Sequence, residues 1–276
     1  MSDDANKEDN SEFFSHEIRK LEEVIQMLRG PHPGFPRRGA PGGFDPLSFS
    51  PYLWHEIRNA GTSVSGGGIV STPDLSGNGF TLKQDTVGDR PAYNSSSANL
   101  NNYASCTMDG AGDHLETDYN LTFSGVFTKF FVVGGATSFG GCFGFTGQSG
   151  AYVSLQRSTD SYVFGAANSQ KFLPGGAGLY QLTGPTILRY QCDGTHAGHK
   201  VFYNGVEQAV TDGFATGDPG AGTFASCALA IGIDHLGGGT SVAVELGADM
   251  LFNRLLSAPE SLAVETYFSL VYGIAI

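Results

Sequence analysis

Two histidines and two carboxylates stand at spacings that a metal centre or a hydrolytic site could use. His196 and His199 lie three residues apart in an expected loop, and Asp193 just before them could supply a third metal ligand. Glu245 and Asp249 lie four residues apart in an expected strand. That spacing differs from the close E-x-D-x-x-E pattern by which sandwich glycosidases place a nucleophile and a general acid. We therefore expect solvated loop histidines and no hydrolytic carboxylate pair.

Other catalytic patterns fail in their context. No G-x-S-x-G elbow stands at an expected strand-to-helix turn. The glycine-rich runs GGCFGFTG and GHKVFYNG are not followed by a phosphate-binding helix. The cysteines lie far apart and form no C-x-x-C pair, which excludes a zinc ribbon or a thioredoxin-type site: Cys106, Cys142, Cys192 and Cys227. We expect buried free thiols, with a late extracellular disulfide as the alternative, and we expect no enzyme.

The composition favours an all-β domain. Forty glycines, 12% aromatic residues and only 15% charged residues suit short strands joined by tight turns. The formal net charge of −12 argues against nucleic acid or anionic lipid as a partner, because both need clustered Lys and Arg. No apolar run approaches a membrane span, and the polar N-terminus lacks a signal-peptide pattern. We therefore expect synthesis in a bacterial cytoplasm and no membrane insertion.

Residues 1–29 are predicted to be an acidic tail followed by an amphipathic segment. Apolar residues recur there at steps of four, three, four and three, the a/d pattern of a short coiled coil: Phe14, Ile18, Leu21, Ile25 and Leu28. About two heptads are too few to hold an oligomer alone, so another surface must contribute. We expect this segment to anchor the protein and to favour a homo-oligomer. The alternative is a helix that lies on its own domain.

Residues 30–46 are predicted to be a linker, because their proline and glycine content prevents a helix or an inner strand. Residues 47–276 then form one large domain, with glycine-rich loops expected at 134–150, 174–184 and 212–223. Asn204-Gly205 predicts a type I′ hairpin. The expected strands are Val126–Val133, Ala151–Leu155, Ser161–Phe164, Thr186–Cys192, Lys200–Tyr203, Val206–Val210 and Ser226–Ile233.

The chain ends with a predicted strand and a predicted helix. Alternation from Val242 to Phe252 indicates a half-buried strand with Glu245 and Asp249 on its polar face. Ser257 and Glu260 then stand at capping-box spacing, with Pro259 in the first turn and Gly273 at the C-cap. The helix should dock through one apolar stripe: Val264, Tyr267, Phe268, Val271 and Tyr272.

The ending ADMLFNRLLSAPESLAVETYFSLVYGI resembles the final core strand and helix of concanavalin A-like (laminin-G-like) jelly-roll domains, which many phage and bacterial surface proteins carry. Five further pieces resemble the family in the expected order: SPYLWHEIRNAG, DLSGNGF, RPAY, MDGAGDHLET and DGTHAGHKVFYNGVEQ. The resemblance implies an antiparallel jelly-roll β-sandwich with a C-terminal capping helix. Trp54 stands where the family places a core aromatic, so we expect it in the core rather than against a sugar.

With the tail and the linker, the resemblance implies a virion surface protein of a phage or phage-like particle: a head fibre, spike, capsid decoration or tail fibre. Its N-terminus would dock on capsid or other virion proteins. Its lectin-like head would attach to host surface polysaccharide. The alternatives are a structural decoration or connector protein whose sandwich only packs against neighbours, and a bacterial surface adhesin module.

Lectin-like sandwiches hold sugars on loops, with an aromatic face below and Asp, Asn or His groups on the hydroxyls. The candidates for glycan binding beside expected loops are Tyr93, Tyr103, Asp113, His114, Asp234 and His235. We expect no cofactor, with Ca²⁺ as the one ion that the resemblance allows on the carboxylates. Binding without cleavage, weak per site and tolerant of salt, is the expected behaviour.

Overall fold

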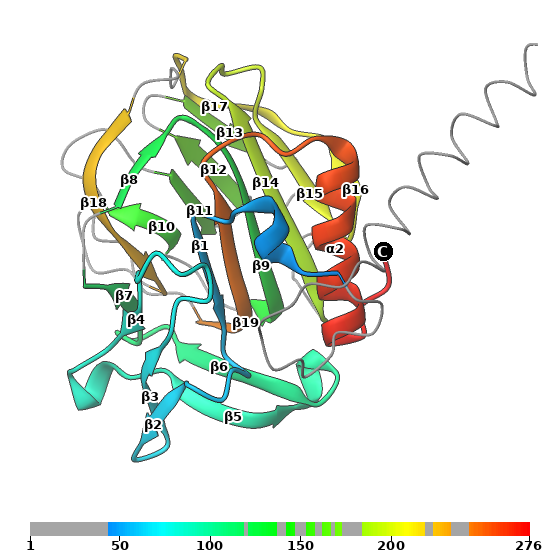
Figure 1. Ribbon diagram of the computed structural model, residues 1–276. Coiled ribbons are helices and arrows are strands. Elements are labelled where there is room, and N and C mark those ends of the chain that lie inside the picture. Colours follow the sequence, from blue (N-terminus) through cyan, green and yellow to red (C-terminus); the bar gives the residue numbers. More distant parts are fainter. Residues whose placement is uncertain are drawn as a thin grey trace, which may run out of the picture.

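A computed structural model of this chain describes residues 44–118, 121–136, 142–146, 153–157, 162–166, 169–172, 184–218, 223–232 and 243–276. The tail, the apolar seam from Phe14 to Leu28 and most of the linker lie outside these ranges. Within them, antiparallel strands form two facing sheets that are joined at one edge, where Gly68 pairs with Ala92, and one α-helix covers the outer face of the first sheet (Figure 1). The predicted all-β sandwich of jelly-roll type with a C-terminal helix is confirmed. No helix in these ranges has the length and apolar character needed to cross a membrane.

The first sheet is built around two long neighbouring strands, β9 (Val126–Ala136) and β19 (Ala243–Phe252). Its first five strands lie in the order β16–β15–β14–β9–β19. The C-terminal half of β19 then pairs with β1 and its N-terminal half pairs with β6, which in turn pairs with β5. The other strands are β1 (Leu53–Glu56), β5 (Ala92–Ser97), β6 (Tyr103–Asp109), β14 (Thr186–Asp193), β15 (Lys200–Tyr203) and β16 (Val206–Gln208). Asn204 and Gly205 join β15 to β16 with φ of 48° and 81°, which confirms the predicted type I′ hairpin.

The second sheet has the order β17–β13–β12–β11–β10–β18–β7–β4–β3–β2, and β8 also pairs with β18. Its strands are β2 (Ser63–Ser65), β3 (Gly68–Thr72), β4 (Leu82–Lys83), β7 (Leu115–Thr117), β8 (Leu121–Ser124), β10 (Cys142–Thr146), β11 (Val153–Arg157), β12 (Tyr162–Ala166), β13 (Ser169–Phe172), β17 (Thr211–Thr216) and β18 (Thr223–Ile231). Three short 3-10 helices lie in the connections: η1 (Pro46–Phe49), η2 (Val87–Asp89) and η3 (Ala98–Leu100).

Two segments predicted to be loops contain strands. β10 lies within residues 134–150, and most of β17 lies within residues 212–223, so the loop predictions are wrong there. The glycines of these segments obscured the strand pattern in the sequence. In the structure a partner strand stabilises β10: Phe143 pairs with Ile231 and Gly144 with Ala230. A glycine tolerates a strand when the neighbouring strand supplies the hydrogen bonds.

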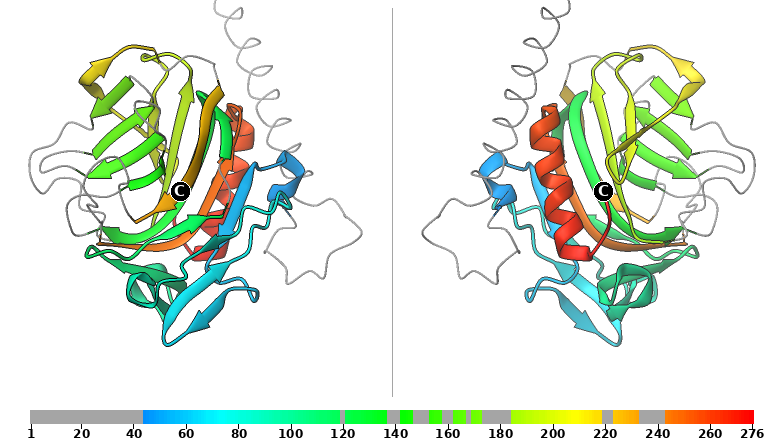
Figure 2. Two further views of the ribbon diagram at one scale, coloured as in Figure 1. Left: turned by 90° about the vertical axis from the view of Figure 1, so that its left-hand side faces the viewer. Right: turned by 90° about the vertical axis from the view of Figure 1, so that its right-hand side faces the viewer.

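The first sheet carries apolar side chains on both faces. Phe127 and Phe131 of β9 enter the inner core between the two sheets, whereas Phe130 and Val132 enter an outer core beneath the helix α2 (Ala258–Tyr272). Figure 2 shows α2 on one side of this sheet and the strands β10 to β13 on the other. Trp54 also belongs to the outer core, with its ring edge-on to Tyr267 at 5.7 Å, which confirms the predicted core role.

Helix α2 begins and ends as predicted. The Ser257 hydroxyl accepts the Glu260 amide, and the Glu260 carboxylate accepts the Ser257 amide, so the capping box is present. Gly273 closes the helix in the left-handed conformation at φ 63°. The predicted apolar stripe is buried over its whole length, from Val264 to Tyr272. The stripe therefore seals the outer face of the first sheet.

The prediction of a half-buried β19 is wrong, because both of its faces are covered. Glu245 and Asp249 are buried instead of facing water. The Glu245 carboxylate accepts hydrogen bonds from Asn99 Nδ2 (2.8 Å) and Ser105 Oγ (2.5 Å). Asp249 forms an ion pair with the buried ammonium of Lys129. Both charges are thus satisfied by partners from other parts of the chain.

The expected single apolar face of β19 is also interrupted. The pairing of β9 with β19 contains two compensating irregularities, one extra residue at Gly134 and one at Gly247. The side chains of β19 therefore exchange faces at Gly247. Val244 and Leu246 before it lie in the inner core, while Ala248, Met250 and Phe252 after it lie in the outer core.

Candidate functional site

The structure separates most of the predicted glycan-binding residues. Tyr93 lies on β5, half-buried against the inner core. Tyr103 begins β6 and packs on Tyr272 of α2, with ring centroids 5.6 Å apart. Only Asp113 and His114 lie together, in the loop from β6 to β7, and the remaining pair, Asp234 and His235, lies outside the described residues.

The loop that holds Asp113 and His114 uses its polar groups internally. His114 Nδ1 donates to the carbonyl of Gly112 (2.7 Å), and Gln84 Nε2 donates to His114 Nε2 (2.9 Å). Asp113 accepts the amide of Asp109 (3.2 Å), and burial, followed by the nearby Asp109 charge, raises the pKa of Asp113. Across the described residues, no group of three His, Cys, Asp or Glu side chains is arranged to hold a metal ion. The polar side chains of this loop are therefore hydrogen-bonded to neighbouring protein groups.

The histidine segment differs from its prediction. His199 is buried, which makes the expectation of a solvated side chain wrong for it: the Tyr190 hydroxyl contacts its Nδ1, and Cys192 Sγ lies 3.6 Å from its Nε2. Protein groups surround His199 in place of water because its loop folds back onto β14. His196 is partly exposed, with Nε2 3.1 Å from Asp212 Oδ1.

Asp193, which the sequence suggested as a third metal ligand, is bound within its own turn. Its Oδ1 accepts both the amide (2.8 Å) and the hydroxyl (2.7 Å) of Thr195, which lowers the pKa of Asp193 and closes a tight turn.

Cys106 and Cys192 are buried free thiols, as predicted. Burial raises the pKa of Cys192 to about 11, so its thiol is protonated at neutral pH. The side chains of Cys142 and Cys227 lie outside those that the structure describes.

A cleft at the edge of the sandwich offers a better candidate site. It encloses about 500 Å³, which falls within the usual size of a small-ligand site. We call it the rim cleft. Three segments distant in sequence form it, and its lining residues are Leu47, Ser50, Pro51, Tyr52, Ser76, Asn78, Asn253 and Arg254.

One carboxylate organises the wall that comes from residues 74–80. Asp74 Oδ1 accepts the amides of Trp54 (3.0 Å) and Ser76 (2.9 Å), while its Oδ2 accepts the hydroxyl of Ser76 (2.7 Å) and the amide of Phe80 (3.1 Å). Charge-assisted bonds of this kind are among the stronger hydrogen bonds in proteins. Asp74 therefore clamps the loop onto the start of β1.

The same clamp positions the aromatic side of the cleft. Asn78 Nδ2 donates to the carbonyl of Tyr52 (2.9 Å), so the amide side chain stands directly over that residue. The half-buried Tyr52 ring packs against Phe80 at 5.2 Å between centroids. A ring supported on one side in this way keeps its orientation.

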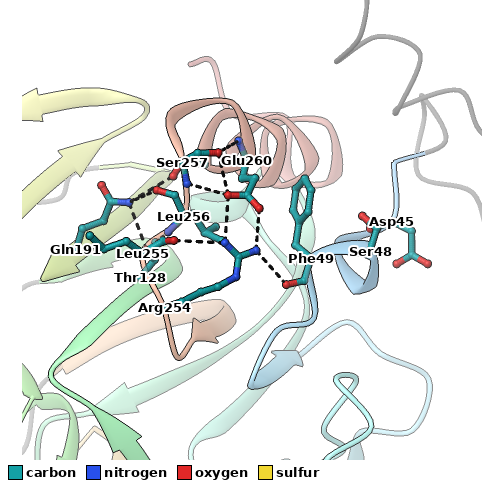
Figure 3. Close-up of polar contacts among 11 residues, drawn as sticks. Asp45, Ser48, Phe49, Thr128, Gln191, Arg254, Leu255, Leu256, Ser257 and Glu260 are labelled. Atoms are coloured by element: carbon teal, nitrogen blue, oxygen red, sulfur yellow. Dashed lines mark hydrogen bonds and ion pairs between the residues drawn. The ribbon is translucent and has the colours of Figure 1, made fainter. Parts of the chain in front are cut away.

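An oriented arginine, Arg254, also lines the cleft, and Figure 3 shows its bonds to Glu260 and Phe49. Arg254 Nη2 donates to Glu260 Oε1 (2.8 Å) and its Nη1 donates to Glu260 Oε2 (3.1 Å), while Nη2 also lies 3.4 Å from the carbonyl of Phe49. Hydrogen bonding to Arg254 lowers the pKa of Glu260 to about 2, and the amide of Ser257 adds to the effect. The pair thus stays ionised and locally neutral across the physiological pH range.

The rim cleft consequently combines an aromatic ring, hydroxyl groups, side-chain amides and a charge-balanced guanidinium. Sequence reasoning missed it, although Tyr52 and Asn78 fall in two of the family-like pieces and Arg254 falls in the ending. Each piece carries only a strand or turn signal. Their convergence depends on the Asp74 clamp and on β1 pairing with β19.

No protein-family model matches the chain, and no curated protein matches its sequence. Solved structures match its fold. A Trypanosoma rangeli sialidase in complex with sialic acid is 14% identical, with a TM-score of 0.51 over 94% of this chain. Domain 4 of AbnA, a GH43 extracellular arabinanase from Geobacillus stearothermophilus, in complex with arabinotriose, is 17% identical, with a TM-score of 0.52 over 78% of this chain.

The binding domain of Paraclostridial Mosquitocidal Protein 1 is 11% identical, with a TM-score of 0.51 over 81% of this chain. The chain spans 38% of the sialidase, 98% of the arabinanase domain and 52% of the toxin structure. At these identities the likeness shows a shared β-sandwich fold, and proteins with this fold include enzymes and binding domains.

Proposed function

We propose that this chain is a carbohydrate-binding, lectin-like β-sandwich and that the rim cleft holds the saccharide. The observation that carries the proposal is the convergence of Tyr52, Asn78 and Arg254 around a cleft of about 500 Å³. Sugars present alternating hydroxyl groups and C–H faces, which this mixture of groups complements. The arabinanase domain of the same fold, solved with arabinotriose, supports the choice of ligand class.

The contacts would divide by chemistry. The Tyr52 ring supplies a flat face for the C–H side of a sugar ring, with Leu47 and Pro51 extending the apolar floor. The Oδ1 of Asn78, whose Nδ2 is bound to the carbonyl of Tyr52, can accept from a sugar hydroxyl, and Asn253 adds a second side-chain amide to the lining. Such groups are rigid before the ligand arrives, because the Asp74 clamp and the Arg254–Glu260 pair fix the two walls.

The charge balance selects for uncharged sugars. Glu260 already occupies both Nη atoms of Arg254, so an anionic sugar would gain little from the guanidinium and would also meet a nearby carboxylate. Screening by salt weakens only charge-dependent attraction. We therefore expect binding of a neutral saccharide that changes little with salt and little with pH above about 4.

We propose binding without cleavage. General acid–base catalysis of glycoside hydrolysis needs carboxyl groups that can exchange a proton near the working pH. Of the carboxylates that contact the lining, Asp74 is committed to four hydrogen bonds from Trp54, Ser76 and Phe80, and Glu260 is held ionised by Arg254, with a pKa of about 2. The role of Glu260 is to position the guanidinium.

The wider biological setting is a further part of the proposal. From the family resemblance, we propose that the chain is a surface protein of a phage or phage-like particle, a head fibre, spike, capsid decoration or tail fibre that attaches to host polysaccharide. Residues 1–29 would anchor it to virion proteins and favour a homo-oligomer. Many copies on one particle would raise a weak single-site affinity through multivalency. A structural decoration protein and an adhesin module remain the competing assignments.

The test uses the full chain, a panel of neutral and anionic oligosaccharides, and calorimetric titration of each hit. Tyr52→Ala should weaken binding by about tenfold or more, equivalent to about 1.4 kcal/mol, because the stacking face is lost. Tyr93→Ala is the matched control, since Tyr93 is also a half-buried tyrosine but lies outside the cleft. It should leave affinity unchanged.

Three results would overturn the proposal. They are the absence of any saccharide ligand in the panel, equal loss in both variants with intact melting curves, and the release of shortened glycan chains during incubation.

A further inference from the structure

The outer side of helix α2 carries apolar side chains that face water. Leu262 and Leu270 lie on one side of the helix, two turns apart, with Thr266 and Ser269 between them. Both leucines are exposed, at 47% and 42%. We call these four residues the α2 outer stripe.

This exposure is concentrated rather than scattered. The large apolar residues found exposed elsewhere in the described chain are three separate valines: Val64, Val87 and Val206. The other four all fall in the last part of the chain: Leu255, Leu262, Leu270 and Ile276. Single exposed apolar residues are ordinary, whereas a cluster on one element indicates a contact surface.

The outer stripe also lacks the charges that a solvent-facing helix normally carries. The only ionisable acids on α2 are Glu260 and Glu265. Glu260 is bound to Arg254, and Glu265 is buried with its Oε1 3.3 Å from Arg189 Nε. In a chain with a net charge of −12, a helix face with leucine, serine and threonine alone suits an apolar partner.

The described chain begins beside helix α2. Phe44 is buried, and its ring lies 5.3 Å from Phe49 and 6.4 Å from Tyr267 of α2. The chain of 43 preceding residues therefore joins the described domain at a point next to α2. These 43 residues include the apolar seam that the sequence predicts from Phe14 to Leu28.

The dimensions of the two stripes agree. Phe14 to Leu28 would span about 22 Å as a helix, and so does α2, which has 15 residues. The residues between Leu28 and Phe44 can extend to roughly 45 Å, which is enough for the segment to lie along the whole of α2.

We propose that residues 14–28 dock as an amphipathic helix on the α2 outer stripe of their own chain. A short tether gives an effective concentration in the millimolar range, which favours this intramolecular contact over a second copy at ordinary protein concentrations. One apolar seam cannot cover α2 and pack on another molecule at once. Assembly through the N-terminal segment must then displace it from α2.

The test places the photo-reactive residue benzoylphenylalanine at Leu262, at Leu270 and, as a control, at Val87, which is exposed in η2. Illumination of the dilute full chain should give products of monomer mass. Mass spectrometry should map them to residues 14–28 from positions 262 and 270 only. Products of dimer mass would overturn the proposal in favour of a second copy, and an absence of cross-links to residues 14–28 would overturn it outright.

Hydrogen exchange supplies an independent readout. In the full chain, the amides of residues 14–28 should exchange on the order of tenfold more slowly than in Leu262→Glu or Leu270→Glu, because an added carboxylate disrupts the apolar contact. The melting temperature should fall by no more than about 5 °C in both variants, the loss expected for a tenfold docking equilibrium, since neither side chain is part of the core. Equal exchange in all three proteins would contradict docking.

Discussion

The buried ion pair of Lys129 and Asp249 predicts an unusual response to substitution. Both side chains are almost fully buried within the sandwich, and His55 Nδ1 lies 3.5 Å from Asp249 Oδ2. Lys129→Met keeps most of the side-chain volume but leaves the carboxylate without its main partner. Breaking a buried pair in this way costs about 3–5 kcal/mol, a large share of the 5–15 kcal/mol that typically holds a domain folded.

The reverse single change, Asp249→Leu, should cost a similar amount because it strands the ammonium. The double variant Lys129→Met, Asp249→Leu removes both charges together and should return to within about 1 kcal/mol of the parent. His55 is present in all four proteins, so its own contribution largely cancels in the cycle. The expected coupling free energy is therefore several kcal/mol.

The pH dependence should change sign between parent and single variant. In the parent, burial works to raise the pKa of Asp249, but Lys129 and His55 outweigh it and the pKa is lowered. A lowered carboxyl pKa contributes stability that is present above about pH 4 and lost as the pH falls. Without Lys129, burial dominates and the pKa rises, so acid should reduce the penalty of the variant.

Urea unfolding, followed by the fluorescence of Trp54, measures all four proteins at pH 7, pH 5 and pH 3. Trp54 is the single tryptophan and lies in the outer core, so its emission reports the loss of the α2 packing. Additive losses in the double variant would refute the reasoning. So would a Lys129→Met protein within about 1 kcal/mol of the parent, since the pair would then be solvated.

Three further outcomes follow from packing. Phe268→Ala should lower the free energy of unfolding by about 3–5 kcal/mol, because its ring is fully buried between α2 and the first sheet. A melting shift of zero would show that the apolar stripe of α2 does not seal the sheet. Gly247→Ala should cost about 1–3 kcal/mol, because the new Cβ would lie 2.8 Å from Tyr272 Cε1. Gly88→Ala, which meets no atom within 4 Å, is its control in the same thermal assay. A chain that starts at Phe44 should melt within about 5 °C of the full chain in calorimetry, because it loses only the proposed docking of residues 14–28 and keeps the sandwich core; an unfolded product would contradict that division.

The parts of the fold that could be predicted depend on local signals. Ser257, Glu260 and Gly273 define α2 through caps whose geometry involves only neighbouring residues. Asn204-Gly205 defines its hairpin in the same way. Local chemistry of this kind is visible in a short stretch of sequence, and these predictions are confirmed.

The burial of Glu245 and Asp249 could not be predicted, because it depends on distant partners. Alternation places a carboxylate on one side of a strand, but only the fold brings Asn99 and Lys129 within reach of these two acids. The rim cleft could not be predicted for the same reason. Its walls come from opposite ends of the domain, and the residues that bring them together, such as Asp74, are outside the lining itself.

The two extra glycines in β9 and β19 form one compensating unit. Glu245 pairs with Gly135 on one side of them and Ala248 with Val132 on the other, so the register is the same before and after the irregularity. A relative that lacked both glycines would keep every other side chain on its present face. Loss of one alone would preserve the same pairs but leave a single uncompensated bulge, which bends the bulged strand and increases its local twist. The flatness of the central pair of strands therefore depends on two glycines that lie far apart in the sequence.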